Sequence, residues 1–163
     1  IYLLYMLYWI FDLDYTLYDI PKEYPFNYSL ITKNMDLKNL LNNLPHNKII
    51  FTNGTKGHAI HTCEIIGILD QFYYSNIYGR YETGFKPSIE SYLKIIDYNN
   101  IKQTDKVIFF EDTIENLVAA KKNFNWITVL IGEYINSPYV DFSFPTINQA
   151  LSFFNNCINK SKA

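Results

Sequence analysis

The chain has 163 residues, 48% of them apolar and 18% charged, a composition that fits a folded globular protein and excludes an intrinsically disordered one. This length suits one domain, 1–163, because a domain of this size buries roughly 70% of its extended surface. The net charge of −2 gives nucleic acid binding no electrostatic support.

Hydropathy and cysteine usage bear on the cellular compartment. The apolar run Ile1–Phe11 is about half as long as a membrane-spanning helix and lacks the basic start of a signal peptide, so we expect no membrane association. Cys63 and Cys157 lie far apart without metal-type spacing. We therefore expect a reducing, cytoplasmic location, with both thiols buried as small apolar groups.

Short apolar runs alternate with segments of helical period. The predicted strands are Leu7–Phe11, Lys48–Thr52, Phe72–Tyr74, Lys106–Phe110 and Trp126–Ile131. The predicted helices are Asp36–Leu44, His58–Ile66, Ile89–Tyr98, Ile114–Phe124 and Ile147–Ile158. This alternation indicates an α/β fold, a Rossmann-like three-layer sandwich around a central, mostly parallel sheet. Ser88 and Thr113 directly precede two of the helices, and we expect their side chains to cap them.

Acidic side chains follow two of the predicted strands. Asp12 and Asp14 leave the first strand, and Glu111 and Asp112 close the strand that begins at Lys106. Carboxylates this close repel one another unless a cation or a shared proton is present, and Mg²⁺ prefers one or two carboxylates plus phosphate oxygens. Taken alone, an Asp-x-Asp pair also fits a simple turn after a strand.

Two further clusters suit an anionic ligand. Thr52-Asn53-Gly54 supplies a hydroxyl, an amide and backbone N–H groups at a strand end, and Lys86, before Pro87, supplies a positive charge. Taken alone, Thr52-Asn53-Gly54 also fits an ordinary turn, and Lys86 also fits an exposed surface lysine. Ligands bind beyond the carboxyl ends of parallel strands, so the four clusters together predict one phosphate site.

In this order, the four clusters resemble the four motifs of the haloacid dehalogenase-like (HAD) superfamily of hydrolases. Asp12, Asp14 and Thr16 resemble its DxDxT motif, and Thr52, Lys86 and the pair Glu111-Asp112 resemble the other three. Phrases such as FDLDYTLYD and FTNGTKGHA look most like its pyrimidine 5′-nucleotidase branch.

The resemblance implies an HAD-like fold and a Mg²⁺-dependent hydrolase of phosphate esters. Asp12 would attack phosphorus, and Asp14 would act as general acid and base. Mg²⁺ would be held by Asp12, the Asp14 carbonyl and Asp112, with Glu111 as a ligand or as a neighbour of the ligands. Thr52, Asn53 and Lys86 would hold the phosphoryl oxygens. Dehalogenases of the superfamily lack the second aspartate, so Asp14 favours phosphate chemistry.

The sequence departs from the resemblance where a cap domain would stand. Residues 13–51 separate the first two motifs, and a helix and a strand occupy much of them, which leaves 18–33 as a short flap. We therefore expect an open site. It would admit a small phosphate ester such as a nucleotide, or a macromolecular one, and a second subunit of a homo-oligomer would be able to close it. The alternatives are a phosphotransferase or mutase, and a catalytically idle binding module.

Several other side chains have weaker signals. His58 and His61 stand three apart on one helix face, which suits either a metal pair or a structural role, and we expect His58 not to be catalytic. Asn116 is expected to orient Glu111 or Asp112. The flap aromatics, Tyr18, Tyr24, Phe26 and Tyr28, suit either base stacking or a small local core.

Overall fold

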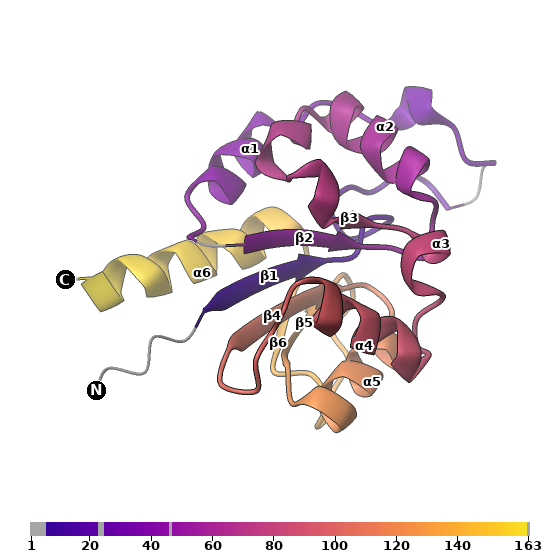
Figure 1. The fold of residues 1–163 in the computed structure, drawn as a ribbon. Helices are drawn as coiled ribbons and strands as arrows, with labels where there is room; N and C mark the ends of the chain where they lie inside the picture. The colour runs from indigo at the N-terminus through magenta and orange to yellow at the C-terminus, as the bar shows by residue number, and fades with distance from the viewer. Residues whose placement is uncertain (1–5, 23–24, 46, 163) are drawn as a thin grey trace.

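The computed structural model describes residues 6–22, 25–45 and 47–162 of the chain. Within these residues the strands form one six-stranded sheet with the order β3-β2-β1-β4-β5-β6 (Figure 1). They are β1 (Leu7–Phe11), β2 (Asn47–Phe51), β3 (Ile77–Tyr78), β4 (Lys106–Glu111), β5 (Ile127–Ile131) and β6 (Phe142–Phe144). Every neighbouring pair is parallel, which confirms the predicted α/β class.

Helices join these strands. They are α1 (Met35–Asn42), α2 (Lys56–Ile66), α3 (Arg80–Thr83), α4 (Ile89–Tyr98), α5 (Ile114–Phe124) and α6 (Ile147–Lys162). Single 3₁₀ turns lie at η1 (Tyr28–Leu30), η2 (Leu69–Gln71) and η3 (Tyr74–Asn76). The five predicted helices are confirmed, with shifts of a few residues at some ends. The short helix α3 was not predicted.

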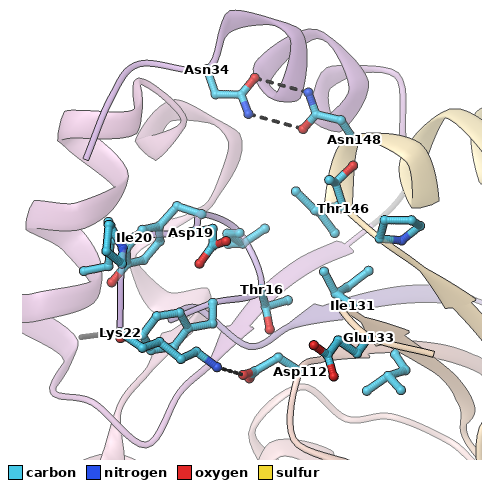
Figure 2. A pocket seen from close by; sticks show the side chains of 18 of the residues that line it. Thr16, Asp19, Ile20, Lys22, Asn34, Asp112, Ile131, Glu133, Thr146 and Asn148 are labelled. Carbon is cyan, nitrogen blue, oxygen red and sulfur yellow. Dashed lines mark hydrogen bonds and ion pairs between the residues drawn. The ribbon is translucent and has the colours of Figure 1, made fainter. Parts of the chain in front are cut away.

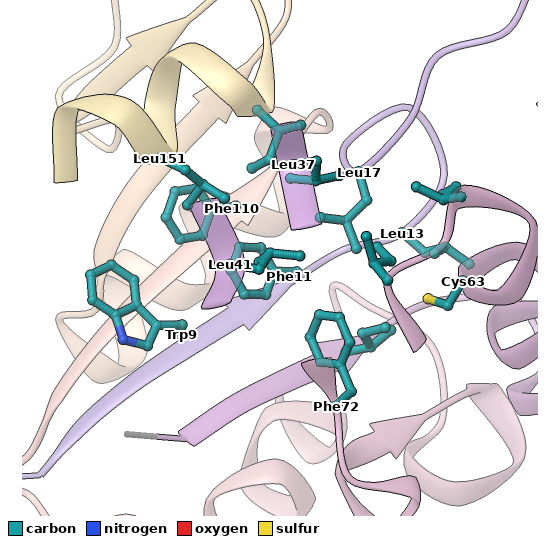
Figure 3. Packing of buried hydrophobic residues seen from close by; sticks show 14 of the residues in the cluster. Trp9, Phe11, Leu13, Leu17, Leu37, Leu41, Cys63, Phe72, Phe110 and Leu151 are labelled. Atoms are coloured by element: carbon teal, nitrogen blue, oxygen red, sulfur yellow. The ribbon is translucent and has the colours of Figure 1, made fainter. Parts of the chain in front are cut away.

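The sheet separates two hydrophobic cores, which makes the three layers. Successive side chains of a strand point to opposite faces, so Trp9 and Phe11 enter the core under α1, α2 and α6, and Ile10 enters the core under α4 and α5. Figure 3 shows the first core, where Phe11 and Phe110 stack with ring centroids 4.8 Å apart. Packing of both faces holds β1 and β4, and therefore their carboxyl ends, in one fixed register.

The predicted strand Phe72–Tyr74 is wrong. Phe72 is buried against Phe11, but the side chains of Tyr73 and Tyr74 are 78% and 68% exposed. The strand that pairs with β2 is β3, a few residues later. Aromatic residues favour strands only where both sides pack. The edge strand β6 was missed because it has three residues and one of its side chains is exposed.

Two smaller expectations also need correction. Ser88 and Thr113 do precede α4 and α5, but neither side chain accepts a hydrogen bond from a helix N–H; the Ser88 hydroxyl donates to Glu90 instead. Cys63 is buried, and burial raises the pKa of its thiol to about 12, whereas Cys157 is exposed on α6. Among the described helices, none has the length and apolarity needed to cross a membrane.

Candidate active site

The site lies where the strand order reverses. β1 pairs with β2 on one side and with β4 on the other, and the register sets Phe11 beside Phe110. The next backbone N–H, that of Asp12, donates to the Phe110 carbonyl at 2.9 Å. Asp12 therefore emerges beside Glu111, in the crevice where open parallel sheets bind ligands.

The loop after β1 is a tight turn anchored in the core. The Leu13 carbonyl accepts the N–H groups of Thr16 at 3.3 Å and Leu17 at 2.9 Å, and the side chains of Leu13 and Leu17 are buried. Tyr15 adopts a left-handed conformation with φ of 61°, which costs about 1 kcal/mol in a non-glycine residue. The turn brings Tyr18 back beside Asp14 and aims the Thr16 hydroxyl at Asp12 Oδ2, 3.1 Å away.

Lys86 is a buried cation at the centre of the site. Its ammonium donates to Asp12 Oδ1 at 2.8 Å, to Glu111 Oε1 at 2.8 Å and to the Phe51 carbonyl at 2.7 Å, so all three of its N–H groups have acceptors. Burial by itself lowers the pKa of Lys86, but Asp12 and Glu111 outweigh it and hold that pKa above its usual value. This lysine is not the exposed surface residue that its sequence context alone suggests.

The loop after β2 fixes the backbone of Lys86. The side-chain amide of Asn53 donates to the Lys86 carbonyl at 3.0 Å and accepts from its N–H at 2.8 Å. These two bonds fix the side chain of Asn53 against the Lys86 backbone and leave the second N–H of its amide and its backbone N–H as donors for a phosphoryl oxygen. The buried hydroxyl of Thr52 accepts from Gly54 N at 3.0 Å and keeps its own proton free to donate.

Gly79 allows this loop to approach β3. A Cβ at Gly79 would stand 2.4 Å from Lys56 N and 2.8 Å from the Gly54 carbonyl, distances that no side chain tolerates. The Gly54 carbonyl also accepts from Arg80 N at 2.9 Å. The absence of a side chain at Gly79 therefore lets residues 54–56 lie against the start of α3, and no sequence signal identified that role.

Glu111 and Asp112 differ in how far the protein satisfies them. Besides Lys86, Glu111 accepts the Asn116 amide at 2.6 Å and the Thr113 N–H at 2.7 Å. Asp112 has weaker partners, the Thr113 hydroxyl at 3.4 Å and the Lys22 ammonium at 4.0 Å. Asn116 therefore orients Glu111, as expected, and Asp112 keeps more free capacity for a ligand.

The acidic groups are crowded enough to retain protons. Burial raises the pKa of Asp12 to about 7; Glu111 and Asp112 add repulsion, and Lys86 offsets part of it. Burial and then Glu111 raise the pKa of Asp112 to about 6. One carboxylate oxygen each from Asp12, Glu111 and Asp112 lie within 4.8 Å of one another. A divalent cation there would remove the repulsion, so these residues fit a metal ion chemically.

Asp14 has a different environment. His58 Nε2 lies 2.8 Å from its Oδ1, and the Tyr18 hydroxyl donates to the same oxygen. Burial by itself raises the pKa of Asp14, but these hydrogen bonds together outweigh it and hold that pKa below its usual value. The structure thus brings His58, which we expected to have no catalytic part, into contact with the predicted acid and base.

His61 lies apart from this contact. Its side chain is half exposed, 3.7 Å from Glu64, and its ring packs on Tyr28 with centroids 4.6 Å apart. In the part of the chain that the structure describes, neither histidine joins a three-ligand cluster, so nothing there supports the metal-pair alternative.

The described part of the flap packs on α2. Phe26 contacts the rings of Tyr28 and His58, and the Tyr28 hydroxyl lies 2.8 Å from His58 Nδ1. Tyr24 lies outside the described residues. Phe26 and Tyr28 therefore pack with the two histidines of α2, and Phe26 remains 47% exposed in this cluster.

A cavity of about 1040 Å³ borders the site on the Asp112 side (Figure 2). Its walls are the loop after β1, the start of the flap with Lys22, and the segments 130–135 and 145–148. Figure 2 shows the Lys22 side chain directed at Asp112 across one wall. The segments that follow β5 and β6 contain no motif, so the sequence did not predict their place beside the site.

The fold of the described chain is that of solved haloacid dehalogenase-like hydrolases. An HAD-like family hydrolase from Streptococcus pneumoniae superposes with a TM-score of 0.65 at 14% identity, over 92% of this chain and 98% of that one. L-2-haloacid dehalogenase from Xanthobacter autotrophicus superposes with a TM-score of 0.62 at 17% identity, over 78% of this chain and 62% of the enzyme.

A phosphatase has the same fold. The HAD phosphatase from Thermococcus onnurineus superposes with a TM-score of 0.57 at 18% identity, over 73% of this chain and 56% of that one. This chain thus spans less than two thirds of the dehalogenase and of this phosphatase. No family model matches the sequence, and no curated protein matches it. The likeness therefore establishes the fold; the pyrimidine nucleotidase branch receives no support from it.

Proposed function

We propose that the chain is a Mg²⁺-dependent phosphomonoester hydrolase of the HAD superfamily that works through an aspartyl-phosphate on Asp12. The observation that carries this proposal is the ammonium of Lys86, held 2.8 Å from both Asp12 and Glu111 at the carboxyl end of β1. Phosphoryl transfer needs in-line positioning and neutralised charge more than elaborate covalent chemistry, and a fixed cation beside the proposed nucleophile supports such a role.

Asp12 is the proposed nucleophile. Lys86 and the Thr16 hydroxyl each bind one of its carboxylate oxygens, which fixes the plane of the carboxylate. A carboxylate oriented in this way attacks phosphorus along one direction only. The Thr52 hydroxyl and the backbone N–H of Asn53 are the donors that we assign to the phosphoryl oxygens, because the Gly54 N–H already donates to Thr52.

The proposed metal ligands are the Asp12 carboxylate, the Asp14 carbonyl and Asp112. The raised pKa values of Asp12 and Asp112 support a cation at this place. Glu111 already accepts three hydrogen bonds from the protein, which favours a role in holding Lys86 over one as a ligand. When bound, Mg²⁺ would supply charge neutralisation at the phosphoryl oxygens.

Asp14 is the proposed general acid and base. It would protonate the departing oxygen and then take a proton from the water that cleaves the aspartyl-phosphate. Its presence separates this site from carbon–halogen chemistry, in which no leaving group needs a proton. The small flap leaves the aspartyl-phosphate accessible to water, which favours hydrolysis over phosphotransfer to a second substrate.

The cavity beside Asp112 bears on the substrate, and the two cysteines bear on the compartment. The cavity beside Asp112 has room for the leaving group of a small ester such as a nucleotide, and a surface ester of a macromolecule would also reach the site. Cys63 and Cys157 are unpaired, which supports a reducing compartment, the cytoplasm.

A release assay tests the proposal. The chain is incubated with nucleoside monophosphates, sugar phosphates, phosphopeptides and a 2-haloacid, with and without Mg²⁺. We expect phosphate release that requires Mg²⁺ and no halide release. Halide release without phosphate release would replace the phosphatase assignment by a dehalogenase one. If the chain releases neither phosphate nor halide, the idle binding module is favoured.

A further inference from the structure

The two contacts of Asp14 converge on one of its oxygens. His58 Nε2 and the Tyr18 hydroxyl both bind Oδ1, and no partner of Oδ2 lies among the described contacts of this carboxylate. A carboxylate oxygen has two lone pairs, so two donors saturate Oδ1. Any proton that Asp14 carries must then sit on Oδ2, because Oδ1 has no lone pair left for it.

Oδ2 faces the side of the loop where the phosphate-binding candidate lies. A Cβ built on Gly54 would stand 3.6 Å from Asp14 Oδ2 and 3.4 Å from the Thr52 hydroxyl. The two oxygens therefore border the same space beside Gly54. A proton on Oδ2 is thus on the side of Asp14 that the phosphoryl group and its leaving oxygen would approach.

The flap contacts the ring nitrogen of His58 that faces away from Asp14. The Tyr28 hydroxyl lies 2.8 Å from Nδ1, and a neutral ring that accepts at Nδ1 must donate from Nε2. Nε2 is the ring nitrogen that contacts Asp14 Oδ1. Thr55 in turn anchors His58, since its hydroxyl accepts the His58 N–H at 3.1 Å as the N-cap of α2.

We propose that His58 and Tyr18 are positioning residues that hold Asp14 by Oδ1 and present Oδ2 as its proton-transferring atom, with Tyr28 selecting the His58 tautomer. This inference rests on the proposed function. It gives the flap a part in catalysis: its Tyr18 and Tyr28 complete the hydrogen-bond chain Tyr28–His58–Asp14–Tyr18. The flap therefore helps to orient the general acid.

The leaving group provides the test. A nitrophenolate departs without a proton, whereas an alkoxide needs one, so general acid catalysis matters only for the alkyl ester. The value of kcat/KM reports the steps through departure of the leaving group. It is measured in Mg²⁺ for p-nitrophenyl phosphate and for an alkyl phosphate, in the wild type and in the variants His58→Leu, His58→Gln, Tyr18→Phe and Asp14→Asn.

We expect His58→Leu and Tyr18→Phe to lose about 30-fold or more on the alkyl ester and less than about threefold on the nitrophenyl ester. Asp14→Asn should lose more kcat/KM than these variants, and again mainly on the alkyl ester. His58→Gln keeps an amide donor near the place of Nε2 and should recover most of the alkyl activity. Tyr73→Phe removes the same hydroxyl from a ring that is 78% exposed and outside the site, so it is the matched control and should behave as wild type on both esters.

A second readout does not depend on turnover. Nitrogen-15 spectra of the imidazoles should show His58 as a single Nε2–H tautomer in the wild type and as a mixture in Tyr28→Phe. Retention of one tautomer in Tyr28→Phe would remove Tyr28 from the proposal.

The outcomes distinguish the positioning role of His58 and Tyr18 from the proposed hydrolase function. Equal losses on both esters, or no loss on the alkyl ester in folded variants, would overturn the positioning role while leaving the hydrolase assignment intact. Tyr18→Phe removes a single oxygen atom, so it keeps the test valid if His58→Leu does not fold. A wild type that cleaves neither ester overturns the proposed function, and this inference with it.

Discussion

The Lys86 ammonium and the Asp12 carboxylate, 74 residues apart in the chain, are in contact at 2.8 Å, and the Lys86 side chain is completely buried. The same ammonium binds Glu111, so one cation neutralises part of two buried acids. This ion cluster links the ends of β1 and β4 to the loop that precedes α4. Its removal should affect both stability and activity.

We expect Lys86→Met to lower the free energy of unfolding by about 3–5 kcal/mol, because it leaves two buried carboxylates without their cation. Urea unfolding measures the loss. Lys38→Met is the control: Lys38 pairs with Asp70 at 2.7 Å on the surface, and its loss should cost less than about 1 kcal/mol. Equal losses in the two variants would contradict the central role of Lys86. Adding Glu111→Gln to Lys86→Met should restore part of the stability.

Asp12→Asn should reduce turnover by more than about a thousandfold while the fold stays intact. An amide cannot serve as the nucleophile, and removing one charge from a crowded acidic cluster relieves repulsion. Steady-state kinetics and circular dichroism test the two halves. Acid-quenched, phosphorus-labelled enzyme should retain label in the wild type and none in Asp12→Asn. Retention of more than a few per cent of activity would count against an aspartyl-phosphate.

Removal of Mg²⁺ should abolish activity, and restoring Mg²⁺ should recover it. Ca²⁺ should substitute poorly, because its larger and more flexible coordination shell positions oxygens less strictly. Thermal unfolding offers a second measurement: Mg²⁺ should raise the midpoint of the wild type and much less that of Asp112→Asn. Activity that survives chelation would remove the metal from the proposal.

Without metal, stability should fall as pH rises from about 5 to 8. The pKa values of Asp12, about 7, and Asp112, about 6, exceed the value of 3.8 that an unperturbed aspartate has. The folded chain thus keeps protons that the unfolded chain has already lost, so these groups contribute stability at low pH and lose it as pH passes their folded pKa values. We expect a decrease on the order of 2 kcal/mol across this range in EDTA.

Added Mg²⁺ and the variant Asp12→Asn provide two control experiments for this pH dependence. Saturating Mg²⁺ should remove most of the slope, since the ion favours the ionised carboxylates. Asp12→Asn should reduce the slope in EDTA, because it deletes the group with the highest of these pKa values. Asp14 has a lowered pKa, so its contribution is lost only as pH falls below this window. A metal-free stability that rises between pH 5 and 8 would contradict the assigned environments of Asp12 and Asp112.

Discrimination between nucleotide bases should be weak. The flap rings Phe26 and Tyr28 already pack against the histidines of α2, so they are not free to stack on a base. We expect kcat/KM for UMP, CMP, AMP and GMP to agree within about tenfold, or about 1.4 kcal/mol. The values should be measured at several protein concentrations to reveal assembly. A hundredfold preference for pyrimidines in the monomer would show that this surface recognises the base.

Much of the fold was predictable because its signals are local. The apolar runs at β1, β2, β4 and β5 and the helical periods between them depend on neighbouring residues, and they indicated a parallel sheet covered on both faces. The same rule placed the acids after β1 and β4 at one edge. Where the local signal was misleading, at Tyr73 and Tyr74, the side chains prefer strands but have no core to enter.

The sequence by itself therefore determined the α/β class and the residue types of the site, including Asp12 and Asp14 after β1 and Lys86 before α4. Only the tertiary structure decided how they interact. Burial made Lys86 an internal counter-ion of Asp12, and the position of α2 brought His58 onto the Asp14 oxygen that Tyr18 also binds. Such contacts join residues tens of positions apart. They depend on the distances between packed elements, and no local pattern of the chain encodes those distances.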